Sequence, residues 1–597
     1  MAQLVPTQAL VKLKNFSGCK FPLRRSSVVT ACDNRRVPHI LDALDDQQRA
    51  AAECVSGPVV IFAGAGTGKT RTITHRIAHA VTSGVHDPSQ SLAVTFTTRA
   101  AGELRGRLGA LGVQGVQVRT FHSAALRQLR FFYPKYFTNA LPNLVPSKAR
   151  FVAEAATMCG ISAQRDVVRD LASEIEWAKV NIMSPESYRT RSEELRRSVG
   201  GDLTPEKVAR VYEAYIARMD EAGAMDFEDV LLMMTSLLQN FPDVAAQVHQ
   251  QYRHFTVDEF QDVSPVQFEL LSLWLGSRDD VCVVGDPAQT IYSFSGATSS
   301  NLLNLGQHFG RAEEYSLTHN YRSTAPIVRV ANQLSVRVSK NSLQLTSVRG
   351  KGPDVSLDEY SCDEDEADQI AGQIRALVDT GVAPRDIAIL YRINSQSENF
   401  EAALSARNIP FTLRGAERFF ERPEVKTALL NLRAGTHVGS DKGLGATVRD
   451  ILSSVGWKSV APEGRAQLES WESLNTLVEL ADDAMVAKPD ATLVDFVQLI
   501  DKRSEMEFAP SANAVTLASI HAAKGLEWEA VFIAGLSEGL LPITHAKTAS
   551  DFAEERRLLY VAITRARTYL RMSWSKSRHR DGKGNRIEST LLRDITI

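Results

Sequence analysis

The sequence is poor in cysteine and has almost no net charge. Its 597 residues include six cysteines, none of them in a CxxC pair. Widely spaced cysteines argue against a disulfide framework or a cysteine zinc site and are typical of a reducing cytoplasm. The 68 Lys and Arg residues nearly balance 70 Asp and Glu residues, for a formal charge of −2. Net charge therefore does not indicate a nucleic-acid partner, and any basic groove has to be local.

Long hydrophobic runs and short internal repeats are also lacking. Because no run of about 18 apolar residues occurs, we expect no membrane-spanning helix and no membrane partner. The chain is 44% hydrophobic and 23% charged, which excludes a largely disordered or collagen-like protein. At about 100–200 residues per domain, the length predicts three to five domains.

The first 38 residues differ in charge from the rest of the chain. They contain seven Lys and Arg residues and one acid, Asp33. A transit peptide, a nucleic-acid-binding arm and a disordered extension are all compatible with this pattern, whereas the apolar core of a secretory signal is missing. We interpret residues 1–38 as a basic, disordered N-terminal extension.

Short apolar runs rich in β-branched residues alternate with helical stretches. The first set of runs covers residues 58–63, 92–96, 254–257 and 281–284, with helices predicted at 100–111 and 265–275. A second set, at 387–391, 515–519 and 531–534, begins after residue 314. Such alternation predicts two α/β units with doubly wound parallel sheets. The acidic run 363–368 is interpreted as a solvated loop or a helix start.

Helical, strand-poor segments interrupt both units. The first α/β unit is expected over residues 39–125 and 216–318, with a helical insertion at 126–215. The second is expected over 319–425 and 508–597, with a short helical insertion at 426–507. The chain therefore reads as two α/β units, each carrying an inserted helical subdomain.

A glycine-rich loop follows the first apolar run and begins a helix. Its residues are Ala63, Gly64, Ala65, Gly66, Thr67, Gly68, Lys69 and Thr70. This context is the one that a phosphate-binding loop requires, because the glycines let backbone N–H groups surround phosphate oxygens. We expect Lys69 to reach the β- and γ-phosphates of ATP and the Thr70 hydroxyl to bind Mg²⁺.

An acidic pair stands at the end of another predicted strand in the same unit. Asp258 and Glu259 follow the apolar run at 254–257. Asp258 is expected to hold Mg²⁺, and Glu259 to orient or deprotonate the water that attacks the γ-phosphate. Together with the glycine-rich loop, the pair predicts a nucleoside triphosphatase.

The order of these motifs resembles that of superfamily 1A helicases of the UvrD/Rep/PcrA type. Further matches are 44–49 (LDDQQR), 93–97 (AVTFT), 120–122 (TFH), 284–292 (VGDPAQTIY), 520–528 (IHAAKGLEW) and 561–566 (VAITRA). Within that family, 70–77 (TRTITHRI), 174–179 (EIEWAK) and 289–294 (QTIYSF) resemble the second UvrD-type helicase of actinobacteria. The resemblance implies two RecA-like motor domains, 1A and 2A, with helical insertions 1B and 2B at the positions given above.

The resemblance also implies roles around ATP. By matching position, Gln48 reads the adenine, Arg71 and Tyr321 pack on its two faces, and Glu527 touches the ribose. Gln289 contacts the γ-phosphate.

Two arginines are implied as charge-neutralising groups. By matching position, Arg322 and Arg565 lie against the γ-phosphoryl group. Both belong to the second α/β unit, so ATP is expected between the two units and is expected to draw them together.

Five residues match family positions along the single-strand path. The aromatic residues Phe96, Tyr292 and Phe294 line that path, with His122 and His521 near the backbone. Stacking of a base on an aromatic ring contributes about 1–3 kcal/mol and is independent of sequence. The implied partners are single-stranded and tailed duplex DNA, with 3′→5′ movement in the bacterial cytoplasm.

The chain also departs from the family pattern. Ser295 stands where the family commonly has arginine, and serine cannot replace a fixed charge and a forked donor. The second insertion is short, and we expect the protein to lack the cysteine-rich linker and C-terminal nucleic-acid-binding domain of some actinobacterial relatives. Unwinding is therefore expected to involve a repair-protein partner.

Four functions stay open at this point. The leading one is an ATP-dependent 3′→5′ DNA helicase in DNA repair or replication restart. A related alternative is a single-strand translocase that displaces proteins with little unwinding. A nucleotide-gated binding protein without motor activity and a DNA-free ATPase fit the motifs less well.

Overall fold

The computed structural model describes most of the chain. The described residues are 40–195, 197, 199, 203–293, 296–297, 300–309, 311–338, 342–414, 422–436, 443–462, 465–488, 490–505, 513–580, 582, 584–593 and 595–597. The predicted extension 1–38, the DNA-path residue Phe294 and its neighbour Ser295 lie outside them. Within these ranges, no helix is both long and apolar enough to cross a membrane.

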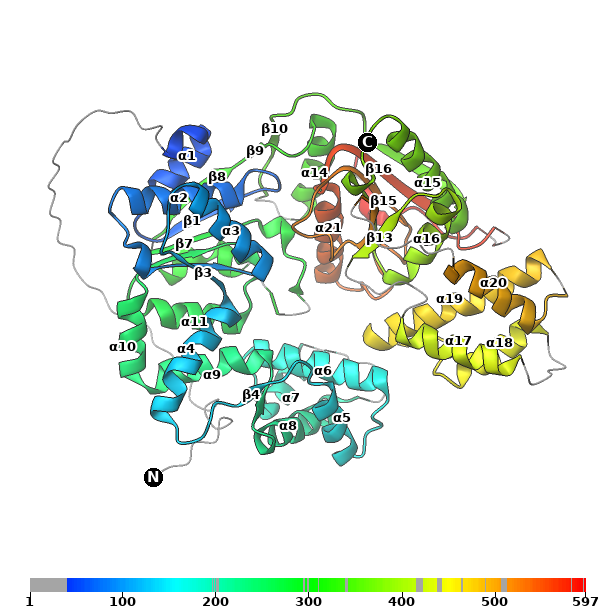
Figure 1. Ribbon diagram of the computed structural model, residues 1–597, viewed down its shortest axis with the longest axis horizontal. Coiled ribbons are helices and arrows are strands. Elements are labelled where there is room, and N and C mark those ends of the chain that lie inside the picture. Colours follow the sequence, from blue (N-terminus) through cyan, green and yellow to red (C-terminus); the bar gives the residue numbers. More distant parts are fainter. Residues whose placement is uncertain are drawn as a thin grey trace.

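The first lobe is built on a six-stranded parallel sheet with the order β3-β2-β6-β7-β1-β8 (Figure 1). Its strands are β1 (Val59–Ala63), β2 (Ser91–Thr95), β3 (Gln117–Thr120), β6 (His254–Val257), β7 (Val281–Gly285) and β8 (Glu313–Leu317). Side chains of a strand alternate between faces, so Val60 enters one core and Ile61 the other. Both faces are covered, which explains the continuous apolar runs.

Helices cover both faces of this sheet. α2 (Lys69–Thr82) and α3 (Thr98–Ala110) supply the core on the face of Ile61. α4 (Phe121–Tyr136), α9 (Phe227–Asn240) and α11 (Pro265–Leu275) pack on the face of Val60. The remaining helices of this region are α1 (Asp46–Glu53), α10 (Pro242–Gln251), α12 (Ser300–Leu303) and α13 (Leu305–His308).

The second lobe has its own six-stranded parallel sheet, with the order β11-β16-β15-β12-β14-β13. Its strands are β11 (Ser356–Cys362), β12 (Ile387–Tyr391), β13 (Phe411–Arg414), β14 (Val515–Ser519), β15 (Trp528–Ile533) and β16 (Ala566–Ser577). α14 (Ala325–Val338) and α21 (Ala549–Ile563) cover one face, and α15 (Asp363–Asp379) and α16 (Ser397–Ala406) the other. The predicted fold class, with two doubly wound parallel sheets, is confirmed.

Two helical units with separate cores extend from the lobes (Figure 1). The first, drawn in cyan and teal, contains α5 (Ala149–Met158), α6 (Arg165–Val180), α7 (Pro185–Glu194) and α8 (Pro205–Glu221). The second, in yellow and orange, contains α17 (Pro423–Gly435), α18 (Leu444–Ser453), α19 (Arg465–Ala487) and α20 (Leu493–Glu505). Two short ribbons complete the fold, β4 (Asn143–Leu144) with β5 (Ala224–Met225), and β9 (His319–Asn320) with β10 (Thr346–Ser347).

The acidic run at 363–368 begins α15, and its acids at 363–366 lie in the first turn, where carboxylates interact favourably with the positive end of the helix dipole. One of these acids is not solvated. Glu366 is 2% exposed and accepts hydrogen bonds from the Gly535 N–H at 2.9 Å and the Ser573 hydroxyl at 2.5 Å. Burial and the neighbouring Asp363 raise the pKa of Glu366 from 4.5 to about 7.

This raised pKa predicts a pH-dependent stability. The folded protein releases the Glu366 proton near pH 7 and the unfolded chain near 4.5, so the free energy of unfolding falls as pH rises across that interval. The parent is expected to lose about 1 kcal/mol of its free energy of unfolding between pH 6 and pH 8 through this group. Glu366→Gln has no carboxyl group at this position, so its free energy of unfolding should not show this loss. Urea unfolding at both pH values tests this. Glu359→Gln, at a half-exposed acid, is the control, and an equal effect of Glu366→Gln at both pH values would contradict the prediction.

Candidate active site

The glycine-rich loop joins β1 to α2 at the carboxyl edge of the first sheet. Gly66 and Gly68 have φ angles of 71° and 84°, which side chains rarely adopt. A Cβ at Gly66 would lie 2.7 Å from the Arg322 Cβ. The loop is therefore shaped for close approach by the second lobe. The Lys69 Nζ donates to the Ala63 carbonyl at 3.2 Å, which holds the ammonium over the loop.

The acidic pair lies opposite this loop, at the end of β6. The Thr70 Oγ1 and the Asp258 Oδ2 are 3.5 Å apart. Burial and the adjacent Glu259 raise the pKa of Asp258 to about 7, although Lys69 opposes that shift. Burial also acts to raise the pKa of Glu259, but Lys69 and Lys524 hold it below its usual value. A cation between Thr70 and Asp258 would offset the cost of keeping two carboxylates charged.

Two arginines of the second lobe reach this position. Arg565 is 1% exposed, and its Nη2 lies 3.4 Å from the Gln289 Oε1 of the first lobe. Burial and Arg322 lower the pKa of Arg565 to about 9, so the guanidinium is a cation at pH 7. The charges of Glu259 and Arg565 also act on each other. The structure thus brings together the five predicted catalytic residues Lys69, Glu259, Gln289, Arg322 and Arg565.

Arg322 is held by its own lobe. Its guanidinium pairs with Glu527 and donates to the Thr564 carbonyl at 3.0 Å. Glu527 also pairs with Arg567. Burial acts to raise the pKa of Glu527, but Arg322 and Arg567 lower it to about 2, so the carboxylate is charged at any physiological pH.

The predicted adenine-contacting residues surround the other end of the loop. The Gln48 Nε2 donates to the Thr67 carbonyl at 2.9 Å, so this glutamine is anchored to the loop backbone. Arg71 donates to the Ala43 carbonyl, and the Tyr321 hydroxyl donates to Asp45. Tyr321 is 43% exposed, leaving ring surface open for stacking.

The predicted DNA-contacting residues fall into two places. Thr95 of β2 pairs with Thr120 of β3, so Phe96 and His122, which follow them, lie at the same sheet edge. His122 is 5.6 Å from the Phe227 ring, and burial lowers its pKa to about 4.

The second pair joins the lobes. The Tyr292 hydroxyl donates to the His521 carbonyl at 3.5 Å. The Lys524 Nζ lies 4.9 Å from the centre of the Tyr292 ring. Tyr292 is partly buried against the core of the second lobe, so it is positioned from both sides.

Comparison with protein families agrees with this arrangement. The UvrD/REP helicase N-terminal domain matches residues 44–310, and the UvrD-like helicase C-terminal domain matches residues 315–461 and 447–577. The chain belongs to the UvrD/Rep helicase family. The predictions of the family and of a helicase enzyme are thereby confirmed.

Individual relatives agree with the subgroup. The ATP-dependent DNA helicase UvrD2 of Mycobacterium tuberculosis is 45% identical over 575 residues, covering 93% of this chain and 82% of the relative. UvrD1 of the same species is 29% identical over 665 residues, covering 93% and 85%. The ATP-dependent DNA helicase PcrA of Leuconostoc citreum is 29% identical over 635 residues, covering 89% and 81%.

This UvrD-type helicase also has an ion pair across the lobes that sequence reasoning missed. The Lys524 Nζ lies 2.7 and 2.5 Å from the two Asp262 carboxylate oxygens and 2.6 Å from the Gln289 carbonyl. Asp262 is 2% and Lys524 9% exposed at the side chain. Lys524 stands in the segment 520–528 and Asp262 lies three residues after Glu259, but their separation in sequence hides the contact.

We predict that breaking the ion pair between Lys524 and Asp262 destabilises the folded protein. Lys524→Met leaves a buried carboxylate without its cation, which is expected to lower the free energy of unfolding by about 3–5 kcal/mol. Adding Asp262→Asn should recover part of that loss, because it removes the orphaned charge. Urea unfolding of both single variants and the double variant measures the coupling, with the exposed Lys547→Met as control. Strictly additive effects would show that the pair contributes nothing.

Proposed function

We propose that this chain is an ATP-dependent DNA helicase that moves 3′→5′ along single-stranded DNA and unwinds duplexes, in DNA repair or replication restart. One observation carries the proposal. Arg322 and Arg565 of the second lobe stand beside the phosphate-binding loop and Glu259 of the first. A triphosphate in that loop would be held by both lobes, so its hydrolysis would change how they fit together.

The residues present suit ATP with Mg²⁺. The loop backbone and Lys69 would bind the phosphates, and Thr70 and Asp258 would hold the metal. The metal supplies charge neutralisation at the phosphoryl oxygens. Glu259, kept ionised by the neighbouring lysines, would orient or deprotonate the attacking water.

Nucleotide binding would redirect Arg322. The ion pair with Glu527 holds the Arg322 guanidinium on the second lobe. Two residues earlier, the Asn320 Nδ2 donates a hydrogen bond to the Ala65 carbonyl of the first lobe at 2.7 Å. A γ-phosphate would compete with Glu527 for Arg322, releasing Glu527 for the ribose. Because Arg322 would exchange Glu527 for the γ-phosphate, ATP binding would be coupled to closure of the two lobes.

The proposed DNA path crosses both lobes. Phe96, Tyr292 and Phe294 would stack on bases, and His122 and His521 would lie near the backbone. The relatives at 45% and 29% identity are named DNA helicases, which supports a DNA substrate. We assign motor domains 1A and 2A and helical insertions 1B and 2B at the boundaries predicted from the sequence.

A second candidate is a translocase that strips proteins from single strands. The short second insertion, whose described helices α17–α20 share one core, favours it, because a short insertion leaves duplex contacts there in doubt. A repair-protein partner would then supply the unwinding function.

Substrate polarity tests both candidates. We expect ATP turnover to rise on adding single-stranded DNA, and duplexes with a 3′ tail to be unwound in preference to those with a 5′ tail. Lys69→Ala is the matched inactive protein. Displacement of streptavidin from a biotinylated strand end, without strand separation, would favour the translocase. Turnover that is indifferent to DNA would contradict both.

A further inference from the structure

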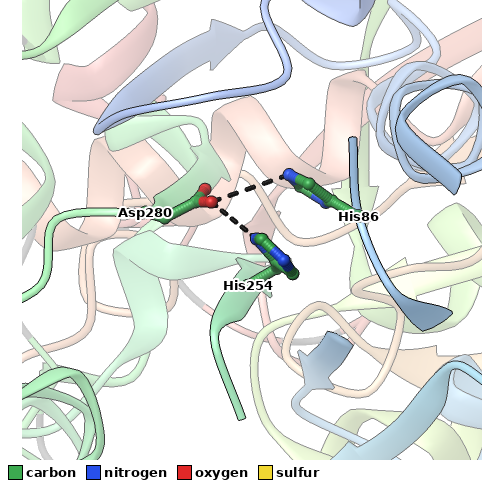
Figure 2. A group of neighbouring side chains, drawn as sticks. All are labelled: His86, His254 and Asp280. Atoms are coloured by element: carbon green, nitrogen blue, oxygen red, sulfur yellow. Dashed lines mark hydrogen bonds and ion pairs between the residues drawn. The ribbon is translucent and has the colours of Figure 1, made fainter. Parts of the chain in front are cut away.

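A cluster of three potential ligands lies in the first lobe, at the sheet edge opposite the phosphate-binding loop (Figure 2). His86 stands between α2 and β2, His254 begins β6, and Asp280 directly precedes β7. Because β1, β6 and β7 are parallel, the amino ends of β6 and β7 lie about 16 Å from the carboxyl edge that bears the nucleotide site. The cluster is thus separate from the proposed active site.

The three side chains converge on one oxygen. The Asp280 Oδ2 lies 2.6 Å from the His254 Nδ1 and 3.6 Å from the His86 Nε2. The two imidazole rings are stacked, with centres 3.6 Å apart. All three ligand atoms lie within 4.8 Å of one another. In Figure 2 both rings point their nitrogen atoms toward the carboxylate.

One ring nitrogen of His86 is buried without a hydrogen-bond partner. His86 is 5% exposed, and the nitrogen without a partner is Nε2. The Val55 backbone accepts a hydrogen bond from the ring, which Nδ1 therefore supplies. When the His86 ring is neutral and Nδ1 carries the proton, Nε2 has a lone pair and is an acceptor. This Nε2 faces a carboxylate oxygen of Asp280. Two acceptors directed at each other need an electropositive atom between them.

The carboxylate of Asp280 also has an unpartnered atom. The Oδ1 of Asp280 is also buried without a hydrogen-bond partner. The cluster therefore presents unused acceptor capacity on two of its three members.

We propose that His86, His254 and Asp280 bind a divalent transition-metal ion of the Zn²⁺ class. Two imidazole nitrogens and a carboxylate oxygen are a ligand set that such ions accept, with a fourth position for water. Tetrahedral bonds of about 2.0–2.1 Å place ligand atoms about 3.3 Å apart, between the two observed separations. The hydrogen bond to Val55 fixes the tautomer of His86 that a metal requires.

Binding requires a small adjustment. A metal lies in the plane of the imidazole that binds it, so two stacked rings cannot both face one ion. His254, 17% exposed at its side chain against 4% for His86, has the room to rotate. The nearby charge of Arg76 opposes a cation, so the affinity is expected to be below that of a closed four-ligand site.

The bound ion would link three segments of the first lobe, namely the connection between α2 and β2, the start of β6 and the residue before β7. α2 runs from Lys69 of the phosphate-binding loop to Thr82, four residues before His86. A metal at His86 would anchor the far end of this helix to β6 and β7. The consequence is stabilisation of the first lobe by linkage, without a part in hydrolysis.

Metal titration of the intact, nucleotide-free protein tests the proposal. Zn²⁺ and Co²⁺ are added in excess Mg²⁺, so that Mg²⁺ competes for the proposed Thr70–Asp258 position. We expect binding of one equivalent of metal, a visible Co²⁺ band of tetrahedral type, and a higher unfolding temperature with Zn²⁺. Asp280→Asn and, separately, His254→Gln are expected to weaken this binding about 10–100-fold.

Controls separate this site from adventitious binding. His545→Gln, at an exposed histidine of the second lobe, should bind like the parent. Retained ATP turnover in both ligand variants shows that they are folded. Absence of stoichiometric binding by the parent, or equal binding by parent and both ligand variants, would overturn the proposal and leave the proposed helicase function untouched.

Discussion

Arg565→Ala is expected to lower the DNA-stimulated kcat for ATP hydrolysis by about 10³–10⁵. Arg565 is buried between the lobes, near Gln289 and within the field of Glu259. In the proposed mechanism its guanidinium neutralises charge that grows on the γ-phosphoryl group only in the transition state. Its removal should therefore reduce kcat far more than nucleotide affinity.

Arg565→Lys distinguishes the catalytic role from a structural one. Lysine keeps a positive charge but loses the forked donor, so most of the activity should still be lost. Turnover and the binding of a fluorescent ATP analogue are measured together, with Arg593→Ala, at an exposed arginine, as the matched control. Wild-type turnover in Arg565→Lys would contradict the assignment of this residue to the phosphoryl group.

Glu259→Gln is expected to lower kcat by about 10²–10⁴ and to leave ATP binding intact. Glutamine can still accept the hydrogen bond that the Gln261 Nε2 makes to Glu259 at 2.5 Å, so the loop geometry is conserved. It cannot accept a proton from water. The variant should therefore bind ATP and single-stranded DNA and stall with both.

Two measurements check this result. Single-turnover hydrolysis reports the chemical step, and filter binding reports DNA affinity with and without ATP. Glu269→Gln, on α11 of the same lobe, is the control because its carboxylate accepts an exposed hydrogen bond from the Gln239 Nε2 at 3.0 Å. A Glu259→Gln protein that hydrolyses ATP at the parent rate would exclude Glu259 as the base.

Strands in the middle of each sheet were predictable from the sequence. The runs 387–391 and 515–519 coincide with β12 and β14, and the predicted helix 265–275 coincides with α11. Strands buried on both faces read as unbroken apolar runs, so local pattern is enough. The long β16 was not predicted, because its Arg, Ser and Lys residues interrupt the apolar pattern.

Contacts between distant residues were not predictable in this way. Glu366 reads as one acid in a solvated run, yet it is buried beneath Gly535 and Ser573. The pairing of Lys524 with Asp262, and the meeting of His86 with His254 and Asp280, leave no local signal. Each contact joins residues that are far apart in the sequence, so it depends on how the whole chain folds.

The sequence alone determined the fold class and the family, and it placed the glycine-rich loop and the acidic pair at strand ends, because each is encoded in neighbouring residues whose spacing the backbone geometry enforces. Only the tertiary structure decided which charges share a buried environment. Electrostatic energies depend on distance and solvent exposure, and both are set when the two sheets and their helices pack against one another.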